Sequence, residues 1–232
     1  MGFSRLRFLI TCAVLLDIPD LFAQGKYAIG TFVSWPVGNF GSTAVGDGSF
    51  AQPGWGIVFE DEARFKSWPD IFSLGLHISY QQNAMDHNAM AQAFSARLNL
   101  PAEVSEAKYR PLLITLGPFF DIPITPKIDI GIKTGIGFAL TNIDSFELTV
   151  YPSPNEAPVQ YGVDFKSSPS FTYLLGINGE LKVSRVIGLT AFVDFSSARS
   201  KLESFVANVG RTQSHYDLSF VNTGLGIAVI FD

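Results

Sequence analysis

The chain has 232 residues and a formal net charge of −5 at pH 7, with 47% hydrophobic and 16% charged residues. This length suits one domain, and the composition excludes a disordered chain. The acidic balance argues against nucleic acid as a partner, because phosphate binding requires a basic face.

Residues 1–23 have the three parts of a secretory signal peptide. Arg5 and Arg7 provide a basic start, an apolar run too short to span a membrane follows, and Ala23 is a small residue at the expected cleavage point. We therefore predict a signal peptide over residues 1–23 and one mature domain over residues 24–232.

The mature sequence divides into eight predicted strands joined by connections of two different lengths. Three connections hold only a few residues, whereas four are long, polar and rich in Gly, Asn, Ser and Pro. The two kinds alternate, as in a membrane barrel that has its termini and short turns in the periplasm and its long loops outside. The strands are predicted near residues 27–35, 50–66, 70–82, 109–124, 128–141, 170–184, 187–201 and 215–231, with long loops at 36–49, 83–108, 142–169 and 202–214.

Side chains alternate with a period of two along these segments, which predicts strands with one apolar face. In the segment 128–141 the even positions are apolar except Thr134, and the odd positions hold Gly, Ala, Thr and two charges. A soluble barrel would place many Lys and Glu on its outer face, but here the second face is mostly small. We therefore predict that the apolar face is turned toward lipid.

The last strand ends with Leu225, Ile227, Val229 and Phe231 in one phase. Its upper half, which contains Leu218 and Phe220, has the opposite phase, and this predicts a bulge near residues 220–223.

The chain opens with the pattern Gly30-x-Phe32-x-Ser34-x-Pro36-x-Gly38-x-Phe40-Gly41 and closes with the strand that ends at Phe231. By these two features it resembles the small outer-membrane β-barrel family, the OmpA-transmembrane, OmpX and PorT-like group. The resemblance implies an all-β fold, an eight-stranded antiparallel up-and-down transmembrane barrel that the outer-membrane assembly machinery inserts by reading a terminal aromatic. Here Asp232 follows Phe231, which departs from that pattern, and no catalytic residue of the family maps onto this sequence.

Charged and polar side chains are predicted on the lumen side of the strands. Eight strands enclose a space that side chains nearly fill, so these charges are expected to pair. We favour a structural polar plug over the alternative, a gated ion path. The predicted lumen network consists of Glu60, Glu62, Arg64, His77, Asp121, Asp129, Lys133, Glu180, Lys182 and Asp194.

No catalytic, cofactor or metal site is predicted. His77 shares its face with Ser73 and Ser79, but spacing along one strand does not establish a hydrolytic site. His87 and His215 fall in or beside loops without a second metal ligand at a recognised spacing. The only cysteine, Cys12, lies within the signal peptide, so the mature domain has no disulfide or thiolate metal site.

Aromatic residues near the strand ends predict the two interfacial belts of a membrane protein. The loop 83–108 has Ala-rich spacing around 89–96 that suggests a short helix, and the loop 142–169 is rich in proline and tyrosine. Recognition would lie in such loops. The predicted belt residues are Trp35, Trp55, Trp68, Tyr80, Tyr109, Phe171, Tyr173 and Tyr216.

These observations predict a non-enzymatic integral protein of a Gram-negative outer membrane, with a structural or adhesive role through its extracellular loops. The expected partners are outer-membrane lipid, the assembly machinery during insertion, and an extracellular ligand or protein. The alternatives are a lipid-modifying outer-membrane enzyme, a narrow pore, and an exported soluble lipocalin-like barrel. The soluble alternative requires Ile132, Ile136, Leu175 and Ile177 to converge on an interior cavity.

Overall fold

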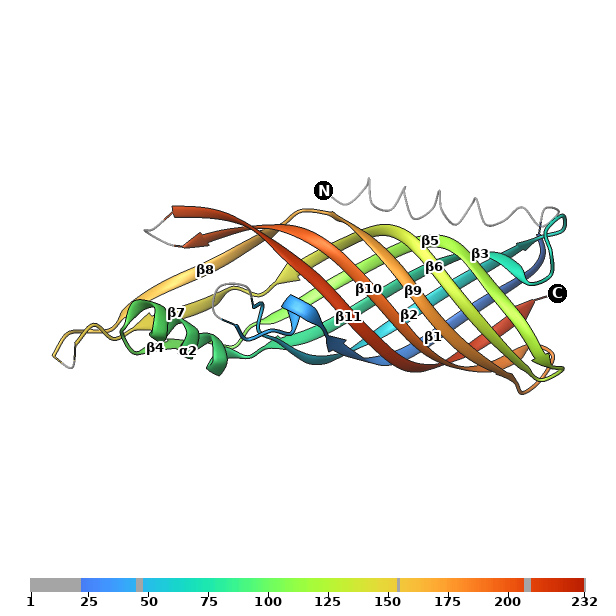
Figure 1. The fold of residues 1–232 in the computed structure, drawn as a ribbon, viewed down its shortest axis with the longest axis horizontal. Helices are drawn as coiled ribbons and strands as arrows, with labels where there is room; N and C mark the ends of the chain where they lie inside the picture. Colours follow the sequence, from blue (N-terminus) through green and yellow to red (C-terminus); the bar gives the residue numbers. More distant parts are fainter. Residues whose placement is uncertain (1–21, 45–47, 154, 207–209, 232) are drawn as a thin grey trace.

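Eight long strands close into a ring in the computed structural model, which describes residues 22–44, 48–153, 155–206 and 210–231 (Figure 1). Each ring strand pairs antiparallel with the next ring strand along the chain, and the last pairs with the first. The predicted signal peptide falls almost wholly outside the described residues. The ring consists of β1 (Phe22–Pro36), β2 (Ala51–Phe65), β3 (Phe72–Met85), β5 (Lys108–Thr125), β6 (Ile128–Ile143), β9 (Ser170–Lys182), β10 (Ile187–Val206) and β11 (Gly210–Phe231).

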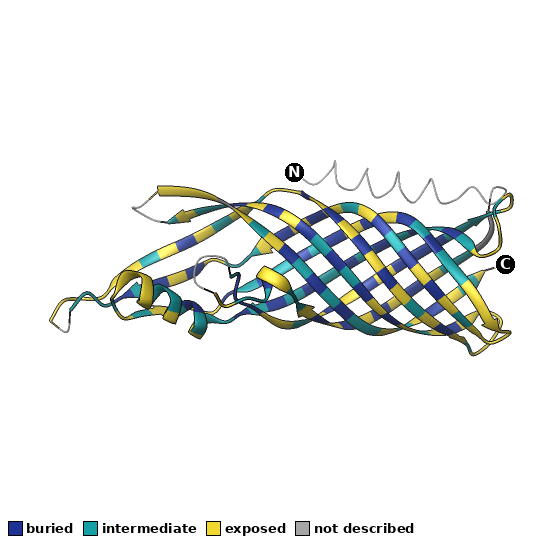
Figure 2. Ribbon diagram, viewed as in Figure 1, coloured by how far each residue is buried: buried dark blue, intermediate teal, exposed yellow. Residues whose placement is uncertain are grey.

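Each of the eight predicted strands coincides with one ring strand, and the predicted apolar faces point outward. Figure 2 shows buried residues alternating with intermediate or exposed ones along the ring strands. Ile132, Ile136, Leu175 and Ile177 are 40%, 63%, 54% and 57% exposed. They therefore do not converge on an interior cavity, and the lipocalin-like alternative is wrong.

The bulge predicted near residues 220–223 is wrong. β11 pairs with β10 without a register shift from Gly210 to Val229, so the even-numbered side chains from Leu218 to Ala228 share the interior face. Leu218 and Phe220 are 0% and 1% exposed. Their phase differs from that of the lower half because the interior of the barrel is apolar at this height, not because the strand changes face.

Beyond the ring, the wall continues on one side as a small sheet, at the end of the molecule opposite the C-terminus (Figure 1). The upper part of β10 pairs with β8 (Val159–Ser167), which pairs with β7 (Phe146–Val150), which pairs with β4 (Ala102–Val104). These short strands lie within the segments 83–108 and 142–169, where the sequence predicts loops. They lack a strong pattern of their own because their pairing depends on the protruding part of β10.

Helix α2 (His87–Leu98) precedes β4 and contains the predicted helix around 89–96. The side chain of Asp86 caps its start by accepting a hydrogen bond from the backbone N–H of Ala89 at 2.9 Å. Asn99 ends it in the left-handed conformation. Among the described residues, no helix combines the length and the apolar character that crossing a membrane requires.

The mouth of the ring next to this sheet is filled by an apolar cluster. The short helix η1 (Gly38–Phe40) places Phe40, which is fully buried, between Tyr109 and Phe220, with ring centroids 4.9 and 4.8 Å away. The Tyr109 hydroxyl donates a hydrogen bond to the backbone oxygen of Ser49 at 2.7 Å. The prediction that Tyr109 belongs to an interfacial belt is therefore wrong, because its side chain is 1% exposed inside the mouth.

Candidate functional site

The outer wall of the ring carries an apolar belt bounded by aromatic residues. On β2, Trp55 is 56% exposed at the edge of the belt nearer the long connections. Phe65 lies ten residues further along the same strand, at the end with the short turns. With a rise of about 3.3 Å per residue and a tilt of about 40°, this separation is about 25 Å along the barrel axis, the height of a lipid-facing band.

At the end with the short turns, four aromatic rings form a chain around part of the rim. Trp68 lies 4.4 Å from Phe65 and 4.6 Å from Phe72, and Phe72 lies 5.1 Å from Phe120, measured between ring centroids. At the other edge of the belt, Trp35, Trp55, Phe171 and Tyr173 are all exposed on the outer face. Two aromatic girdles around an apolar band are typical of barrels that span a lipid bilayer.

The closed ring and the belt together place this protein in a Gram-negative outer membrane. A closed ring leaves no unpaired strand edge within the bilayer, which is the condition for a β structure to span it. A wall in which Ile136, Phe138 and Leu225 are each more than 60% exposed would be costly in water.

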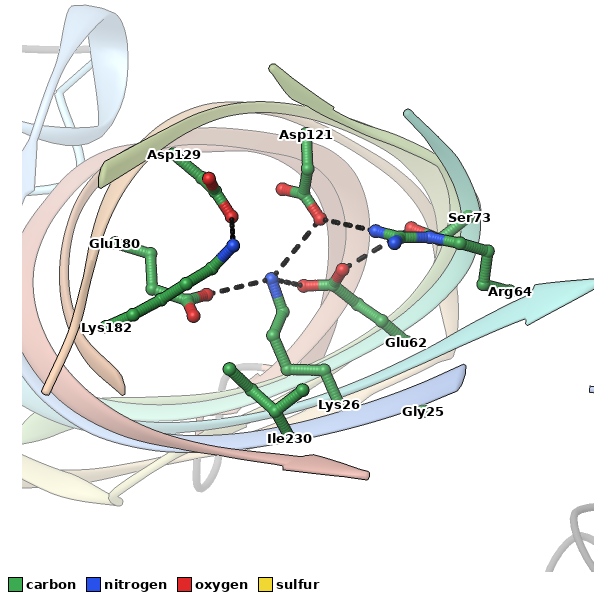
Figure 3. A pocket seen from close by; sticks show the side chains of 10 residues that line it. All are labelled: Gly25, Lys26, Glu62, Arg64, Ser73, Asp121, Asp129, Glu180, Lys182 and Ile230. Carbon is green, nitrogen blue, oxygen red and sulfur yellow. Dashed lines mark hydrogen bonds and ion pairs between the residues drawn. The ribbon is translucent and has the colours of Figure 1, made fainter. Parts of the chain in front are cut away.

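Inside the ring, near the short turns, lies a lower ionic layer that Figure 3 shows from close by. Its central group is the Lys26 ammonium, whose Nζ lies 2.7 Å from Glu62 Oε1, 3.2 Å from Glu180 Oε2 and 3.4 Å from Asp121 Oδ2. One ammonium is thus shared by three carboxylates. We define the lower ionic layer as Lys26, Glu62, Arg64, Asp121, Asp129, Glu180 and Lys182.

The other contacts of this layer join its sides. Arg64 Nη2 lies 3.4 Å from Asp121 Oδ2, and Lys182 Nζ lies 2.7 Å from Asp129 Oδ2. Ser73 donates a hydrogen bond from its Oγ to the second oxygen of Glu62 at 3.3 Å. The layer therefore holds four carboxylates and three cations among the described residues, a formal net charge of −1 with every group ionised.

An upper ionic layer follows toward the mouth, defined as Glu60, His77, Lys133 and Asp194. Lys133 pairs with Glu60 and with Asp194, whose Oδ2 lies 3.0 Å from its Nζ. His77 Nδ1 lies 2.8 Å from Glu60 Oε1, which indicates a hydrogen bond from the imidazole N–H to the carboxylate. All four side chains are deeply buried, with exposed fractions from 1% to 11%. The pairing offsets the cost of burying these charges.

Glycines on the inner wall make room for these large side chains. A Cβ added to Gly176 would lie 2.1 Å from Asp194 Oδ1 and 2.8 Å from Lys133 Cε. Phe192 also enters the interior, with its ring centroid 4.8 Å from Lys133 Nζ and 6.3 Å from the ring centroid of Phe32. Small wall residues and large lumen residues thus alternate to fill the interior.

Between the upper ionic layer and the apolar mouth, uncharged polar groups line the lumen. Asn222 donates a hydrogen bond to Gln81 Oε1 at 3.2 Å, and Asn83 donates to the backbone oxygen of Gln52 at 3.0 Å. The interior therefore changes along the axis from charged, through neutral polar, to apolar.

Comparisons with known proteins were made for sequence and for structure. No protein-family model matches the chain, and no curated protein matches it in sequence. Solved outer-membrane proteins have a similar architecture. A major outer membrane protein of Thermus thermophilus has 10% identity and a TM-score of 0.48, covering 89% of this chain and 99% of that chain.

Two further structures are similar over most of their length. Ail, the attachment invasion locus protein of Yersinia pestis, has 10% identity and a TM-score of 0.47, covering 90% of this chain and 98% of that one. The outer membrane protease OmpT of Escherichia coli has 7% identity and a TM-score of 0.41, covering 92% of this chain and 98% of that one. These identities are too low to transfer a role from those proteins to this chain.

All ten residues of the predicted lumen network lie in the two ionic layers. The sequence analysis missed Lys26, the central cation, because the first strand was expected to begin at residue 27. A usable signal was present: Lys26 has the same phase as Ala28 and Phe32, which both face the interior. The pairs themselves depend on register across strands, and spacing along one strand does not contain that information.

The candidate catalytic histidine lies far inside the wall. His77 is 2% exposed, and its one hydrogen-bond partner is Glu60, not a serine. The Ser73 hydroxyl donates its hydrogen bond to Glu62 and not to His77. Within the described residues, the single group with metal-ligand spacing is Glu60, His77 and Asp194. The Lys133 ammonium already pairs with both carboxylates of that group, so we assign no metal to it.

Proposed function

We propose that the barrel is a closed, non-enzymatic membrane anchor, with its short turns in the periplasm and its long connections outside. Its function would be to present the protruding sheet to an extended segment of an extracellular partner protein. The observation that supports this proposal is an open strand edge on β11, beyond the membrane belt.

The open edge begins where β1 ends. Pairing of β1 with β11 stops at Pro36 and Phe220, followed by one hydrogen bond from the Val37 N–H to the Ser219 oxygen at 2.9 Å. β11 nevertheless continues to Gly210, paired with β10 on its other side. No other described residue hydrogen-bonds through its backbone to the outer edge of residues 210–218.

The geometry of Ser219 shows which backbone groups this edge offers. In an antiparallel ladder the N–H and C=O of one residue point to the same side, and successive residues alternate. Because the Ser219 oxygen faces β1, the N–H and C=O of residues 211, 213, 215 and 217 face the open side. Four residues with free donors and acceptors can pair with an added strand.

This edge lacks three of the devices that usually prevent strand addition, although it carries two charged residues, Arg211 and Asp217. Proteins block exposed edges with proline, lysine or bulges. Residues 210–219 contain no proline and no lysine, and the strand has no register shift with β10. Most side chains of this segment are exposed, so a partner could approach the edge without displacing them.

The interior supports an anchor better than a narrow pore or an enzyme. The apolar cluster around Phe40 fills the mouth, and ion pairs fill the opposite half. Transport of an ion would require both to rearrange. The enclosed position of His77 supports a non-enzymatic role.

The proposal is tested by removing backbone donors from the open edge. Displayed random peptides are selected against the purified full chain in detergent, and the selected peptides are measured against Gln213→Pro and His215→Pro. We expect at least a tenfold loss of affinity, because each proline removes an N–H that faces the open side.

The matched controls are Gln213→Ala and His215→Ala, which remove the side chain and keep the N–H. They should bind the selected peptides as the natural chain does. Heat-modifiable gel mobility checks that every variant is folded. Equal binding to the Pro variants, or a selection that enriches no peptide, would contradict strand addition at β11.

A further inference from the structure

The lower ionic layer holds four carboxylates and three cations, and two of its buried carboxylate oxygens have no described hydrogen-bond donor. The ammonium of Lys26 has three N–H donors, and three carboxylates surround it. Lys182 pairs with Asp129, and Arg64 pairs with Asp121. No described donor reaches the second oxygen of Glu180.

That second oxygen is both buried and unsatisfied. The Glu180 side chain is 3% exposed, and no protein group donates a hydrogen bond to its Oε1. Asp129 Oδ1 is likewise buried and accepts no hydrogen bond from a protein group. A buried carboxylate oxygen without a donor costs on the order of 1–3 kcal/mol or more. The strand register adds repulsion between like charges, because Asp129 on β6 and Glu180 on β9 are directly opposite each other.

Space is available among the side chains that carry these oxygens. A cavity of about 70 Å³ lies among the side chains of the layer, and Glu180 and Asp129 both line it (Figure 3). A water-sized sphere needs roughly 10–15 Å³ of such space, so the cavity can hold a small ion with a few waters. The layer can be reached from the short-turn end, where the side chains of Lys182 and Arg64 are 35% and 23% exposed.

We propose that this cavity binds one small monovalent inorganic cation, Na⁺ or K⁺, with Glu180 as its principal protein ligand and water completing its shell. This goes beyond the anchoring role and does not depend on it. Oxygen donors alone favour a hard cation over zinc or copper. With every group ionised the formal net charge is −1, which a single positive charge cancels and a divalent ion would overcompensate.

The test is thermal unfolding of the full chain in detergent, followed by heat-modifiable gel mobility. Chlorides of Na⁺, K⁺ and N-methylglucamine are compared at equal ionic strength and pH. A cation that binds only the folded state raises the unfolding midpoint as its concentration increases. We expect a higher midpoint in Na⁺ or K⁺, because N-methylglucamine is too large for the cavity.

Two variants locate the effect. Glu180→Gln makes the layer neutral and should abolish the difference between the salts, whereas Glu147→Gln removes the same charge from the exposed face of β7 and should preserve it. Equal midpoints in all three salts overturn the proposal, as does a response that survives in Glu180→Gln. If the unfolding midpoint is the same in all three salts but rises as the pH falls, a proton and not a metal cation neutralises the layer.

A direct measurement covers the case in which Glu180→Gln does not fold. Crystals of the natural chain are soaked in a thallium(I) salt, and anomalous scattering locates the ion. We expect a peak within coordination distance of Glu180. A map without a peak in the cavity, or with peaks on the outer surface alone, overturns the proposal.

Discussion

Gly56 lies directly against the ring of Phe32, so that a Cβ on Gly56 would stand 2.3 Å from Phe32 Cζ. The two residues are register partners on β2 and β1, and Phe32 is 5% exposed inside the ring. The absence of a side chain at Gly56 therefore gives the phenyl ring its place in the lumen.

We predict that Gly56→Ala lowers the free energy of unfolding by about 1–3 kcal/mol, the usual cost of overpacking a core. The measurement is urea unfolding of the refolded barrel. Gly179→Ala is the matched control, because its Cβ would meet no atom within 4 Å. Equal losses in the two variants would show that the contact with Phe32 is not the cause.

Lys133 gives a second prediction, since it neutralises two buried carboxylates. Lys133→Met leaves Glu60 and Asp194 without their cation in a layer that water barely reaches. Removing one partner of a buried ion pair costs about 3–5 kcal/mol. We expect a loss of this size in urea unfolding, compared with almost none for Lys127→Met in an exposed turn.

A rescue experiment separates charge from packing at Lys133. Adding Asp194→Asn to Lys133→Met removes one of the stranded charges, so the double variant should recover part of the lost stability. If the double variant is no more stable than Lys133→Met, the stranded charge of Asp194 is not the cause of the loss, and the lost contact of Lys133 Nζ with the Phe192 ring becomes the better explanation.

The apolar mouth should loosen when its central ring is removed. Phe40 contacts Tyr109 and Phe220, and nothing else in η1 is buried. We predict that Phe40→Ala increases hydrogen exchange at the backbone N–H groups of η1, while exchange in the belt region of β6 stays unchanged. Faster exchange throughout β6 would mean that the mouth cluster stabilises the whole ring.

The sequence predicted the fold well where one physical cause, contact with lipid, sets the apolar alternation along a whole strand. The alternation in β6 and β9 predicted their bounds to within two residues, and it predicted their lipid-facing sides, because lipid contact selects large apolar side chains at every second position. β11 shows the limit of that rule. Leu218 and Phe220 are apolar for a different reason, packing in the mouth, and the phase pattern alone does not distinguish the two.

The pairs in the ionic layers illustrate what the sequence did not contain. Glu60 and Lys133 lie far apart in the chain, on strands that are not neighbours, and they meet only because the ring closes. Likewise β4, β7 and β8 form on the protruding end of β10, and their own residues indicate loops.

The membrane placement predicts how deep each tryptophan lies. Single-tryptophan variants are reconstituted in bilayers whose lipids carry bromine at defined depths, and fluorescence quenching is measured. Trp55 and Trp68 mark the two ends of the belt, so bromine near the headgroups should quench them most strongly. Ile136→Trp, in a background without the natural tryptophans, replaces a side chain that is 63% exposed on the outer wall between the girdles. Its quenching should instead be strongest with bromine near the chain ends. The reverse order would mean that the aromatic girdles do not mark the bilayer interfaces and that the belt must be placed at another height on the barrel.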